Sequence, residues 1–244
     1  MSLQTIKNEL TKDLTLIGSR QVEIGKESQP FIFSPCLTIY LGKIGSGKSN
    51  LIMNLLEKKS SPYHKFFKHI WLVSPSARYD DKMADLVQEL DEEKKYYSDL
   101  NNDVLKEIYD RNQAILEAWT EKKNKKSDLN NLLILDDCIH AIKGNKSVLL
   151  NEIVTRLRHI RLNIWITSQK YNFIPTIIRN QISQMGIFRT ENQHELKTIM
   201  EEIGCDHNKF LKAYEFSTLE PFSFLWIKIN PRCIYFKGFD RIVF

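Results

Sequence analysis

The segment Gly42–Ser49 reads GKIGSGKS, and its residue types could bind the phosphates of a nucleotide. It matches the pattern GxxxxGK[ST], in which glycines let successive backbone N–H groups point at anionic oxygens. Lys48 would bring a compact positive charge to the β- and γ-phosphates, and the Ser49 hydroxyl could ligate Mg²⁺. The segment therefore predicts a site for ATP and Mg²⁺. The expected contacts are Gly42, Lys43, Ile44, Gly45, Ser46, Gly47, Lys48, Ser49 and Asn50.

Two adjacent carboxylates, Asp136 and Asp137, end the apolar run that starts at Asn131. In phosphate-loop enzymes an aspartate at the end of a buried strand holds Mg²⁺, directly or through water, and Asp136 is predicted to do so. Successive strand side chains point to opposite faces, so Asp137 could orient or deprotonate the attacking water. Many ATPases use the longer glutamate at this second position. The alternative for either aspartate is a helix N-cap, a position that aspartate favours.

A third polar group, Gln169, follows the apolar run that starts at Asn163. Its amide could donate to the γ-phosphate and accept from the attacking water; the alternative is an ordinary polar residue at the start of a loop. Arginines flank this run, with Arg158 before it and Arg179 after it. A guanidinium from a neighbouring subunit could stabilise charge in the transition state, whereas the alternative is a solvated basic helix face.

The elements that must position these residues can be read from hydrophobic patterning. Glycine-rich, charged and proline-containing stretches separate the apolar runs, and we find no internal repeat. The predicted strands are Pro35–Leu41, His69–Pro75, Asn131–Asp137, Asn163–Gln169, one marked by Ile187–Phe188, and a final hairpin of Phe222–Ile229 and Cys233–Phe239 with its turn at 230–232. The predicted helices are Asn50–Lys59, Ser147–His159 and Glu195–Ile203, together with most of residues 80–126.

The order of these elements predicts an α/β fold with a mostly parallel central sheet flanked by helices. Along the chain, the strand His69–Pro75 lies between the phosphate loop and the paired aspartates. That additional strand favours the RecA-like, additional-strand P-loop ATPases over the nucleotide-kinase or GTPase type. We expect an N-terminal arm over residues 1–30 and an ATPase domain over 31–244, with 76–130 as a charged helical insertion.

Composition narrows the class of protein further. The chain has 244 residues, of which 42% are hydrophobic, and this is enough apolar content to exclude disorder as a class. No apolar run approaches the ~18–20 residues of a membrane span, and no signal-peptide core is present at the N-terminus. The four scattered cysteines fit reduced thiols. The net charge of +5 is compatible with a polyanionic partner or with ordinary surface variation.

Taken together, the segments GKIGSGKS, KHIWLVSP, LLILDDC and RHIRLNIWITSQKYNFIPTIIRN resemble the DNA-packaging ATPases of large double-stranded DNA viruses. The resemblance is to the poxvirus type, with relatives in giant viruses and virophages, within the FtsK–HerA superfamily of DNA-pumping motors. It runs from about Leu37 to Phe188. Positions that match the family pattern are Arg158, His159, Gln169, Tyr171, Pro175 and Arg179, whereas Leu157 stands where a glycine is usual.

The resemblance implies an ATP-driven translocase that packages a viral genome into a preformed capsid. Gln169 would be the sensor glutamine, and Arg158 or Arg179 the arginine finger. The implied partners are double-stranded DNA, bound without sequence preference, and capsid or portal-vertex proteins. Subunits would form a pentameric or hexameric ring in the host cytoplasm, at the viral factory, with the virion as a second location.

Several lysines are candidates for the DNA-contacting surface of such a ring, namely Lys143, Lys146 and the run 122–126, which reads KKNKK. Two other functions remain open from the sequence. One is a P-loop kinase of a small substrate, and the other is an ATP-clamped DNA-associated protein that does not translocate.

Overall fold

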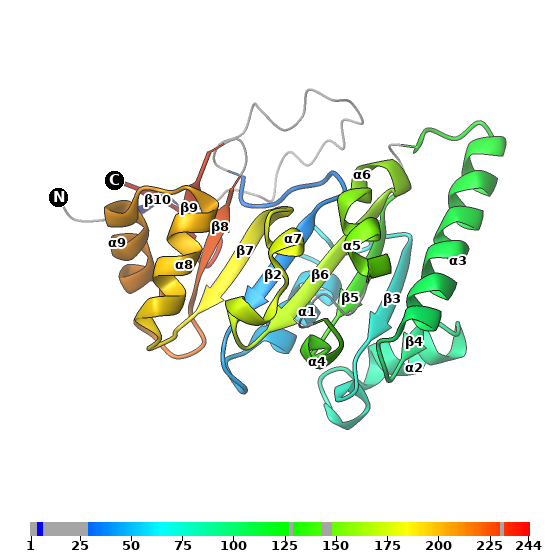
Figure 1. Ribbon diagram of the computed structural model, residues 1–244, viewed down its shortest axis with the longest axis horizontal. Coiled ribbons are helices and arrows are strands. Elements are labelled where there is room, and N and C mark those ends of the chain that lie inside the picture. The colour runs from blue at the N-terminus through cyan, green and yellow to red at the C-terminus, as the bar shows by residue number, and fades with distance from the viewer. Residues whose placement is uncertain (1–3, 7–28, 127–128, 143–147, 230–231) are drawn as a thin grey trace.

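The computed structural model describes residues 4–6, 29–126, 129–142, 148–229 and 232–244 (Figure 1). Within these residues, ten strands form one sheet in the order β1-β10-β9-β8-β7-β2-β6-β5-β3-β4. The strands are β1 Gln4–Ile6, β2 Leu37–Leu41, β3 His69–Val73, β4 Tyr96–Tyr97, β5 Asn131–Leu135, β6 Leu162–Ser168, β7 Ile182–Phe188, β8 Phe224–Lys228, β9 Ile234–Lys237 and β10 Asp240–Val243.

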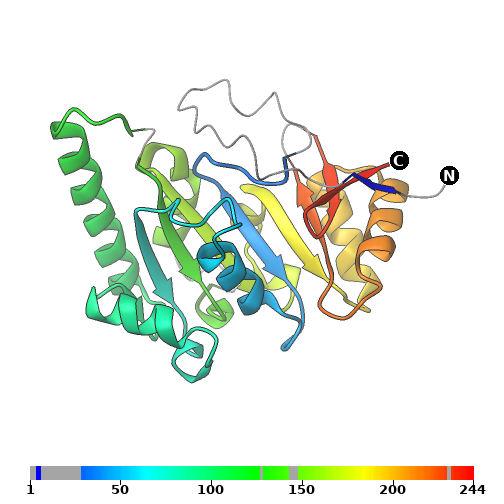
Figure 2. The ribbon, with the colours of Figure 1, turned by 180° about the vertical axis from the view of Figure 1, so that it is seen from behind.

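Helices cover both faces of this sheet, as the two opposite views show (Figures 1 and 2). The helices are α1 Lys48–Glu57, α2 Ala84–Glu92, α3 Asn102–Glu121, α4 Ile139–Ile142, α5 Val148–Thr155, α6 Leu157–Ile160, α7 Thr176–Arg179, α8 Gln193–Ile203 and α9 His207–Ser217, with short 3₁₀ turns η1 Ala77–Tyr79 and η3 Tyr171–Phe173. None of the described helices is long and apolar enough to cross a membrane.

The sheet has a parallel part and an antiparallel part. Strands β7, β2, β6, β5, β3 and β4 pair in parallel, whereas β8, β9, β10 and β1 continue the sheet in antiparallel pairs. Parallel strands are covered on both faces, and this explains why β2, β5 and β6 are buried along their whole length. The predicted α/β class with a mostly parallel sheet is confirmed.

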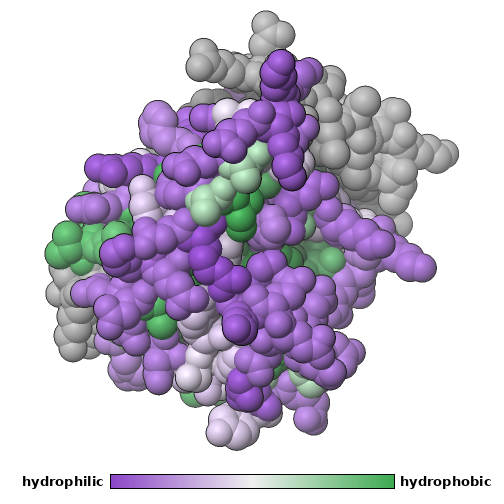
Figure 3. Space-filling model, turned by 90° about the vertical axis from the view of Figure 1, so that its right-hand side faces the viewer, coloured by the Kyte–Doolittle hydropathy of each residue, from purple (hydrophilic) through white to green (hydrophobic). Residues whose placement is uncertain are grey.

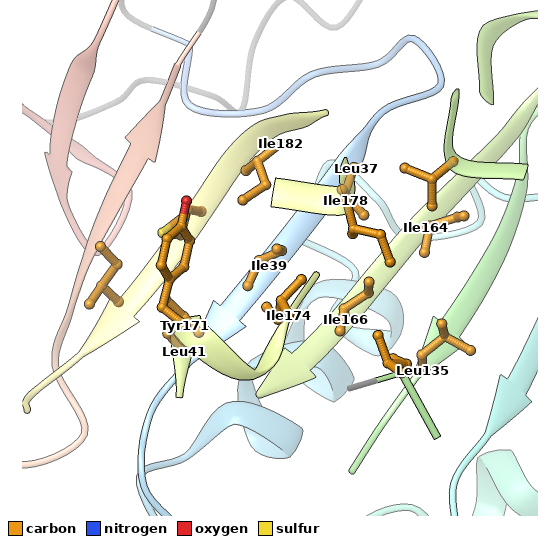
Figure 4. Close-up of a cluster of buried hydrophobic side chains, with 14 of the residues drawn as sticks. Leu37, Ile39, Leu41, Leu135, Ile164, Ile166, Tyr171, Ile174, Ile178 and Ile182 are labelled. Atoms are coloured by element: carbon orange, nitrogen blue, oxygen red, sulfur yellow. The ribbon is translucent and has the colours of Figure 1, made fainter. Parts of the chain in front are cut away.

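Successive side chains of the central strands point to opposite faces of the sheet, and each face contributes to a separate hydrophobic core. Leu37, Ile39 and Leu41 of β2 enter a core that they share with residues of α5, α7 and α8. Figure 4 shows these three side chains together with Ile164 and Ile166 of β6. Tyr40 enters the opposite core with α1 and α2, where Trp165 lies 5.7 Å away between ring centroids. The strand that leads into the phosphate loop is therefore held on both faces.

The charged segment 76–130 contains α2, β4 and α3 and lies at the β3 edge of the sheet (Figure 1). The side of the molecule seen in Figure 3 is mostly hydrophilic. Most of residues 80–126 is helical, as predicted, while Tyr96–Tyr97 forms a short strand that pairs with β3. At the other edge, Gln4–Ile6 of the predicted N-terminal arm pairs with β10.

Some predicted elements differ from those observed. The strand marked by Ile187–Phe188 starts at Ile182, and the predicted helix after the aspartates is divided at Arg156 into α5 and α6. The predicted hairpin is confirmed as β8 and β9, although residues 230–231 of its predicted turn at 230–232 lie outside the described residues. Helix α9 and strand β10 were not expected.

The strand order confirms the additional-strand type, although the inserted strand is not the expected His69–Pro75. Along the chain β3 separates the phosphate loop from the aspartates, but in the sheet the strand between β2 and β5 is β6, and β3 lies beyond β5. The strand that precedes Gln169, β6, therefore lies between the two motifs, because it pairs with both β2 and β5.

Candidate active site

The predicted phosphate loop joins the end of β2 to the start of α1, at the carboxyl ends of the parallel strands. The Gly42 N–H donates to the Ser168 carbonyl at 3.0 Å, so the start of the loop is joined to the end of β6. Within the loop, the Ser46 N–H donates to the Lys43 carbonyl at 3.2 Å. The loop is therefore a defined turn attached to the neighbouring strand.

The first turn of α1 is arranged to receive an anion. Gly47, at the N-cap of the helix, has a left-handed backbone conformation with φ 104°. No side chain caps the helix, and its first turn contains no acidic residue. The initial N–H groups of a helix lack intrahelical partners and carry the positive end of its dipole. The Ser46 hydroxyl is also buried and has no hydrogen-bond partner among the described residues. These unsatisfied donors fit the phosphates of a nucleotide.

Lys48 is buried beneath the same loop. Its ammonium donates to the carbonyls of Gly42 at 2.7 Å and Lys43 at 3.0 Å. Burial lowers the pKa of Lys48, whereas the negative charges of Asp137 and Asp136 raise it. The charge of Lys48 is thus directed to the loop and to the two aspartates.

Asp136 is held by hydrogen bonds from the strands on both sides of β5. The Thr167 hydroxyl of β6 donates to Oδ1 at 2.8 Å, and the Ser74 hydroxyl after β3 donates to Oδ2 at 3.1 Å. Burial raises the pKa of this carboxyl, while the two hydroxyl donors favour its charged form. These bonds differ from the N-cap alternative, because they join Asp136 to neighbouring strands and not to the N–H groups of α4.

Asp137 is half-buried and adopts a left-handed backbone conformation with φ 52°. Its N–H donates to the Thr167 hydroxyl at 3.0 Å, so one hydroxyl bonds to both aspartates. Because β5 ends at Leu135, this turn, and not strand alternation, sets the direction of Asp137. A left-handed non-glycine residue is uncommon and costs free energy, which is typical of functional sites.

Gln169 is exposed and directly follows Ser168, whose carbonyl receives the Gly42 N–H. The structure therefore brings the phosphate loop, the two aspartates and Gln169 to one sheet edge, as the sequence predicted. Of the remaining predicted contacts, Lys43, Ile44, Gly45 and Asn50 are exposed and Ser49 is half-buried.

Arg158 lies at the other end of β6. It is exposed on α6, which precedes the seven-residue strand, at the upper edge of Figure 1. At about 3.3 Å per residue, the strand separates Arg158 from its own phosphate loop by about 20 Å. Arg158 therefore cannot reach the nucleotide site of the same chain.

Arg179 is engaged inside the chain. Its guanidinium forms a 2.9 Å ion pair with Glu202 and lies 4.9 Å from the centre of the Tyr171 ring. It also donates to the side chains of Asn172 and Thr176. The structure thus gives Arg179 local partners between α7 and α8, away from the phosphate loop.

Ser74 and Thr167 are site residues that the sequence reasoning missed. Each is a small polar residue at or near the end of a predicted buried strand, at the edge that also carries Asp136. That position was the available signal, because the carboxyl ends of parallel strands share one edge.

The donor set fits Mg²⁺ held jointly by protein and nucleotide. No group of three or more His, Cys, Asp or Glu side chains able to hold a metal occurs in the described part of the chain. Ser49 and Asp136 are oxygen donors of the kind Mg²⁺ prefers, and such sites are completed by substrate phosphates and water.

The candidate DNA-contacting lysines are only partly described. Lys143 and Lys146 lie outside the described residues, whereas the run 122–126 is exposed after the end of α3.

Comparison with known proteins gives a family match over most of the chain. The family model described as "Poxvirus A32 protein" matches residues 30–217. No curated protein sequence is a significant match.

Solved structures with the same fold include viral packaging proteins and a conjugation coupling protein. The DNA-packaging ATPase B204 from Sulfolobus turreted icosahedral virus has a TM-score of 0.57 at 21% identity, over 86% of this chain and 97% of that chain. The genome packaging NTPase B204 from Sulfolobus turreted icosahedral virus 2, in complex with ATP-gammaS, has a TM-score of 0.55 at 20% identity, over 81% and 94%. The pCW3 conjugation coupling protein TcpA, with ATPgS, has a TM-score of 0.54 at 15% identity, over 85% and 62%.

Proposed function

Because the chain belongs to the poxvirus A32 protein family, we propose that it is an ATPase that moves double-stranded DNA into a preformed viral capsid. The observation that carries the catalytic part is the position of Asp136. This buried carboxylate is hydrogen-bonded by Thr167 and Ser74 at the edge where Lys48 lies under the phosphate loop. Similar structures include B204 proteins described as packaging enzymes, one in complex with ATP-gammaS.

In the proposed reaction the loop N–H groups and Lys48 bind the β- and γ-phosphates of ATP. Mg²⁺ held by Ser49 and Asp136 would supply positive charge to the phosphate oxygens. Asp137 orients the attacking water or accepts its proton, and Gln169 donates to the γ-phosphate. The Lys48 ammonium moves from the carbonyls of Gly42 and Lys43 to the phosphates.

The proposal includes a ring of subunits. An arginine that acts on a neighbour's nucleotide needs a second subunit, and a closed ring gives every site one. Arg158 supports this arrangement because it is exposed and distant from its own phosphate loop. We propose Arg158 as the arginine that completes the adjacent site.

Double-stranded DNA and a capsid or portal-vertex protein are the proposed partners, and the infected host cytoplasm is the proposed location. Contacts with DNA phosphates would be independent of sequence and sensitive to salt. The exposed lysines of the run 122–126, and Lys143 and Lys146, are the proposed DNA contacts.

ATP hydrolysis with and without linear double-stranded DNA tests this function. We expect DNA to stimulate wild-type hydrolysis, and we expect Lys48→Ala and Asp136→Ala to abolish it. Asp137→Asn should bind ATP and hydrolyse it slowly. Absence of turnover with and without DNA would favour an ATP-clamped protein, and phosphoryl transfer from labelled ATP to nucleosides would favour a kinase.

A further inference from the structure

An exposed aromatic ring lies beside the phosphate loop and has no role in the chemistry described above. Phe222 precedes β8, and 73% of its surface is accessible to solvent. Its backbone is left-handed, with φ 62°, a conformation that costs free energy for a residue with a bulky side chain. Neither the exposure of an apolar ring nor this backbone conformation stabilises the folded chain.

The ring borders the loop that receives phosphates. A Cβ atom added to Gly47 would lie 3.6 Å from Cδ1 of Phe222 and 3.6 Å from Cε1 of Phe188. Both rings also line an open hollow of about 340 Å³ that reaches Gly45 and Ser46. The hollow is therefore continuous with the phosphate loop and has aromatic surface on one side.

Strand order sets which end of a nucleotide would reach this hollow. Asp136 and Gln169 follow β5 and β6, on one side of β2. Phe188 ends β7 and Phe222 precedes β8, on the other side of β2. When the γ-phosphate faces Asp136, the nucleoside end of the same molecule extends toward the two phenylalanines.

We infer that Phe222 is the stacking surface for the base of the bound nucleotide, with Phe188 forming the floor of the same hollow. The Phe188 ring is itself supported by Phe224, at 5.3 Å between ring centroids. Stacking on an aromatic face accepts any base, because every base has a π-face. This inference rests on the proposed function, since it assumes that the phosphate loop binds a nucleoside triphosphate.

Comparing the affinities for two ligands distinguishes contacts to the base from contacts to the phosphates. We would titrate wild type and Phe222→Ala by calorimetry, first with ATP and then with inorganic tripolyphosphate. Both ligands are used in the presence of Mg²⁺. We expect Phe222→Ala to weaken ATP binding by about tenfold, because the stacking contact is lost. Tripolyphosphate has no base, so its affinity should be unchanged. Phe222→Trp should bind ATP at least as well as wild type.

A matched control is Tyr79→Ala, which removes another exposed ring, 89% accessible, that does not line the hollow. It should leave the affinity for both ligands unchanged. If Phe222→Ala lowers the affinity for ATP and for tripolyphosphate equally, the inference is wrong and the ring instead supports the phosphate loop. Unchanged ATP affinity would also overturn it, and an accompanying change in oligomeric state would make Phe222 a subunit contact.

The outcome for wild type separates this inference from the proposed function. If wild type binds neither ATP nor tripolyphosphate, the proposed function fails and the stacking role fails with it. If wild type binds both and Phe222→Ala binds both equally well, only the stacking role is wrong.

Discussion

The Thr167 hydroxyl donates a 2.8 Å hydrogen bond to Oδ1 of Asp136 and so connects β6 to the carboxylate proposed to hold Mg²⁺. The hydroxyl oxygen of Thr167 also accepts a hydrogen bond from the Asp137 N–H at 3.0 Å. Gln169 follows Thr167 by two residues. One buried hydroxyl therefore positions both aspartates relative to the strand that carries the sensor candidate.

Thr167→Val tests this role, because valine has nearly the same shape and lacks the hydroxyl. We expect kcat for ATP hydrolysis to fall by about tenfold to a hundredfold, the effect of losing a hydrogen bond to a charged group. The affinity for ATP should change little, since the hydrogen bonds of the Thr167 hydroxyl join it to Asp136 and Asp137 and not to the phosphate loop. Steady-state kinetics with Thr167→Ser as the control checks this, and an unchanged kcat in Thr167→Val would contradict it.

Two glycines of the phosphate loop should respond differently to alanine. At Gly42 a Cβ atom would lie 2.4 Å from Ser46 Oγ and 2.9 Å from Phe188 Cβ, whereas at Gly45 it would meet nothing within 4 Å. We expect Gly42→Ala to destabilise the protein by about 2–3 kcal/mol through overpacking and to impair ATP binding. Gly45→Ala should cost about 1 kcal/mol, because only its left-handed φ of 74° is strained. Urea denaturation measures both, and a larger loss in Gly45→Ala would refute the packing argument.

We expect substitution of Arg158 to lower activity and substitution of Arg179 to lower stability. Arg179→Met breaks the partly buried ion pair with Glu202 and should lower stability by about 2 kcal/mol. Arg158→Met removes an exposed group and should change stability by less than about 0.5 kcal/mol. In the assembled protein, Arg158→Met should instead reduce kcat by about a thousandfold. The reverse pattern of stability and activity would assign the arginine finger to Arg179.

Glu195 should make stability depend on pH. This buried carboxylate of α8 accepts the Tyr171 N–H, and burial raises its pKa above the ordinary 4.5, although the Tyr171 hydrogen bond and the charge of Lys170 oppose the rise. A raised pKa means that the folded state retains a proton that the unfolded state has lost. The contribution of Glu195 to stability therefore decreases as pH rises from 4.5 through the raised pKa.

Glu195→Gln keeps a carbonyl acceptor for Tyr171 and removes the titration. We expect its stability relative to wild type to increase with pH above 4.5 and then to level off. Glu195→Ala, which leaves the N–H without a partner, should lose about 1–3 kcal/mol. Urea denaturation between about pH 4 and pH 8 measures these differences. Identical pH curves for wild type and Glu195→Gln would show that the carboxyl does not titrate in this window.

Elements with strong local patterns could be predicted from the sequence. The apolar runs of β2, β5 and β6 and the glycine loop before α1 contain their own signals, since hydrophobic burial and glycine geometry act within a few residues. Helix α9 also contains such a signal, because Phe210, Ala213, Tyr214 and Ser217 are buried at helical spacing. Strand β10 follows a turn at Gly238, whose φ is 59°, and it is only four residues long.

The chemistry of the phosphate loop was readable from the sequence because its groups are contiguous and come from one turn. The partners of Asp136 were not, because Thr167 and Ser74 lie 31 and 62 residues away and reach the carboxylate only through the order of strands in the sheet. The same applies to Arg179, whose ion pair with Glu202 depends on the packing of α7 near α8. Hydrophobic periodicity specifies which residues are buried, whereas strand order specifies which buried residues meet, and only the folded sheet contains that information.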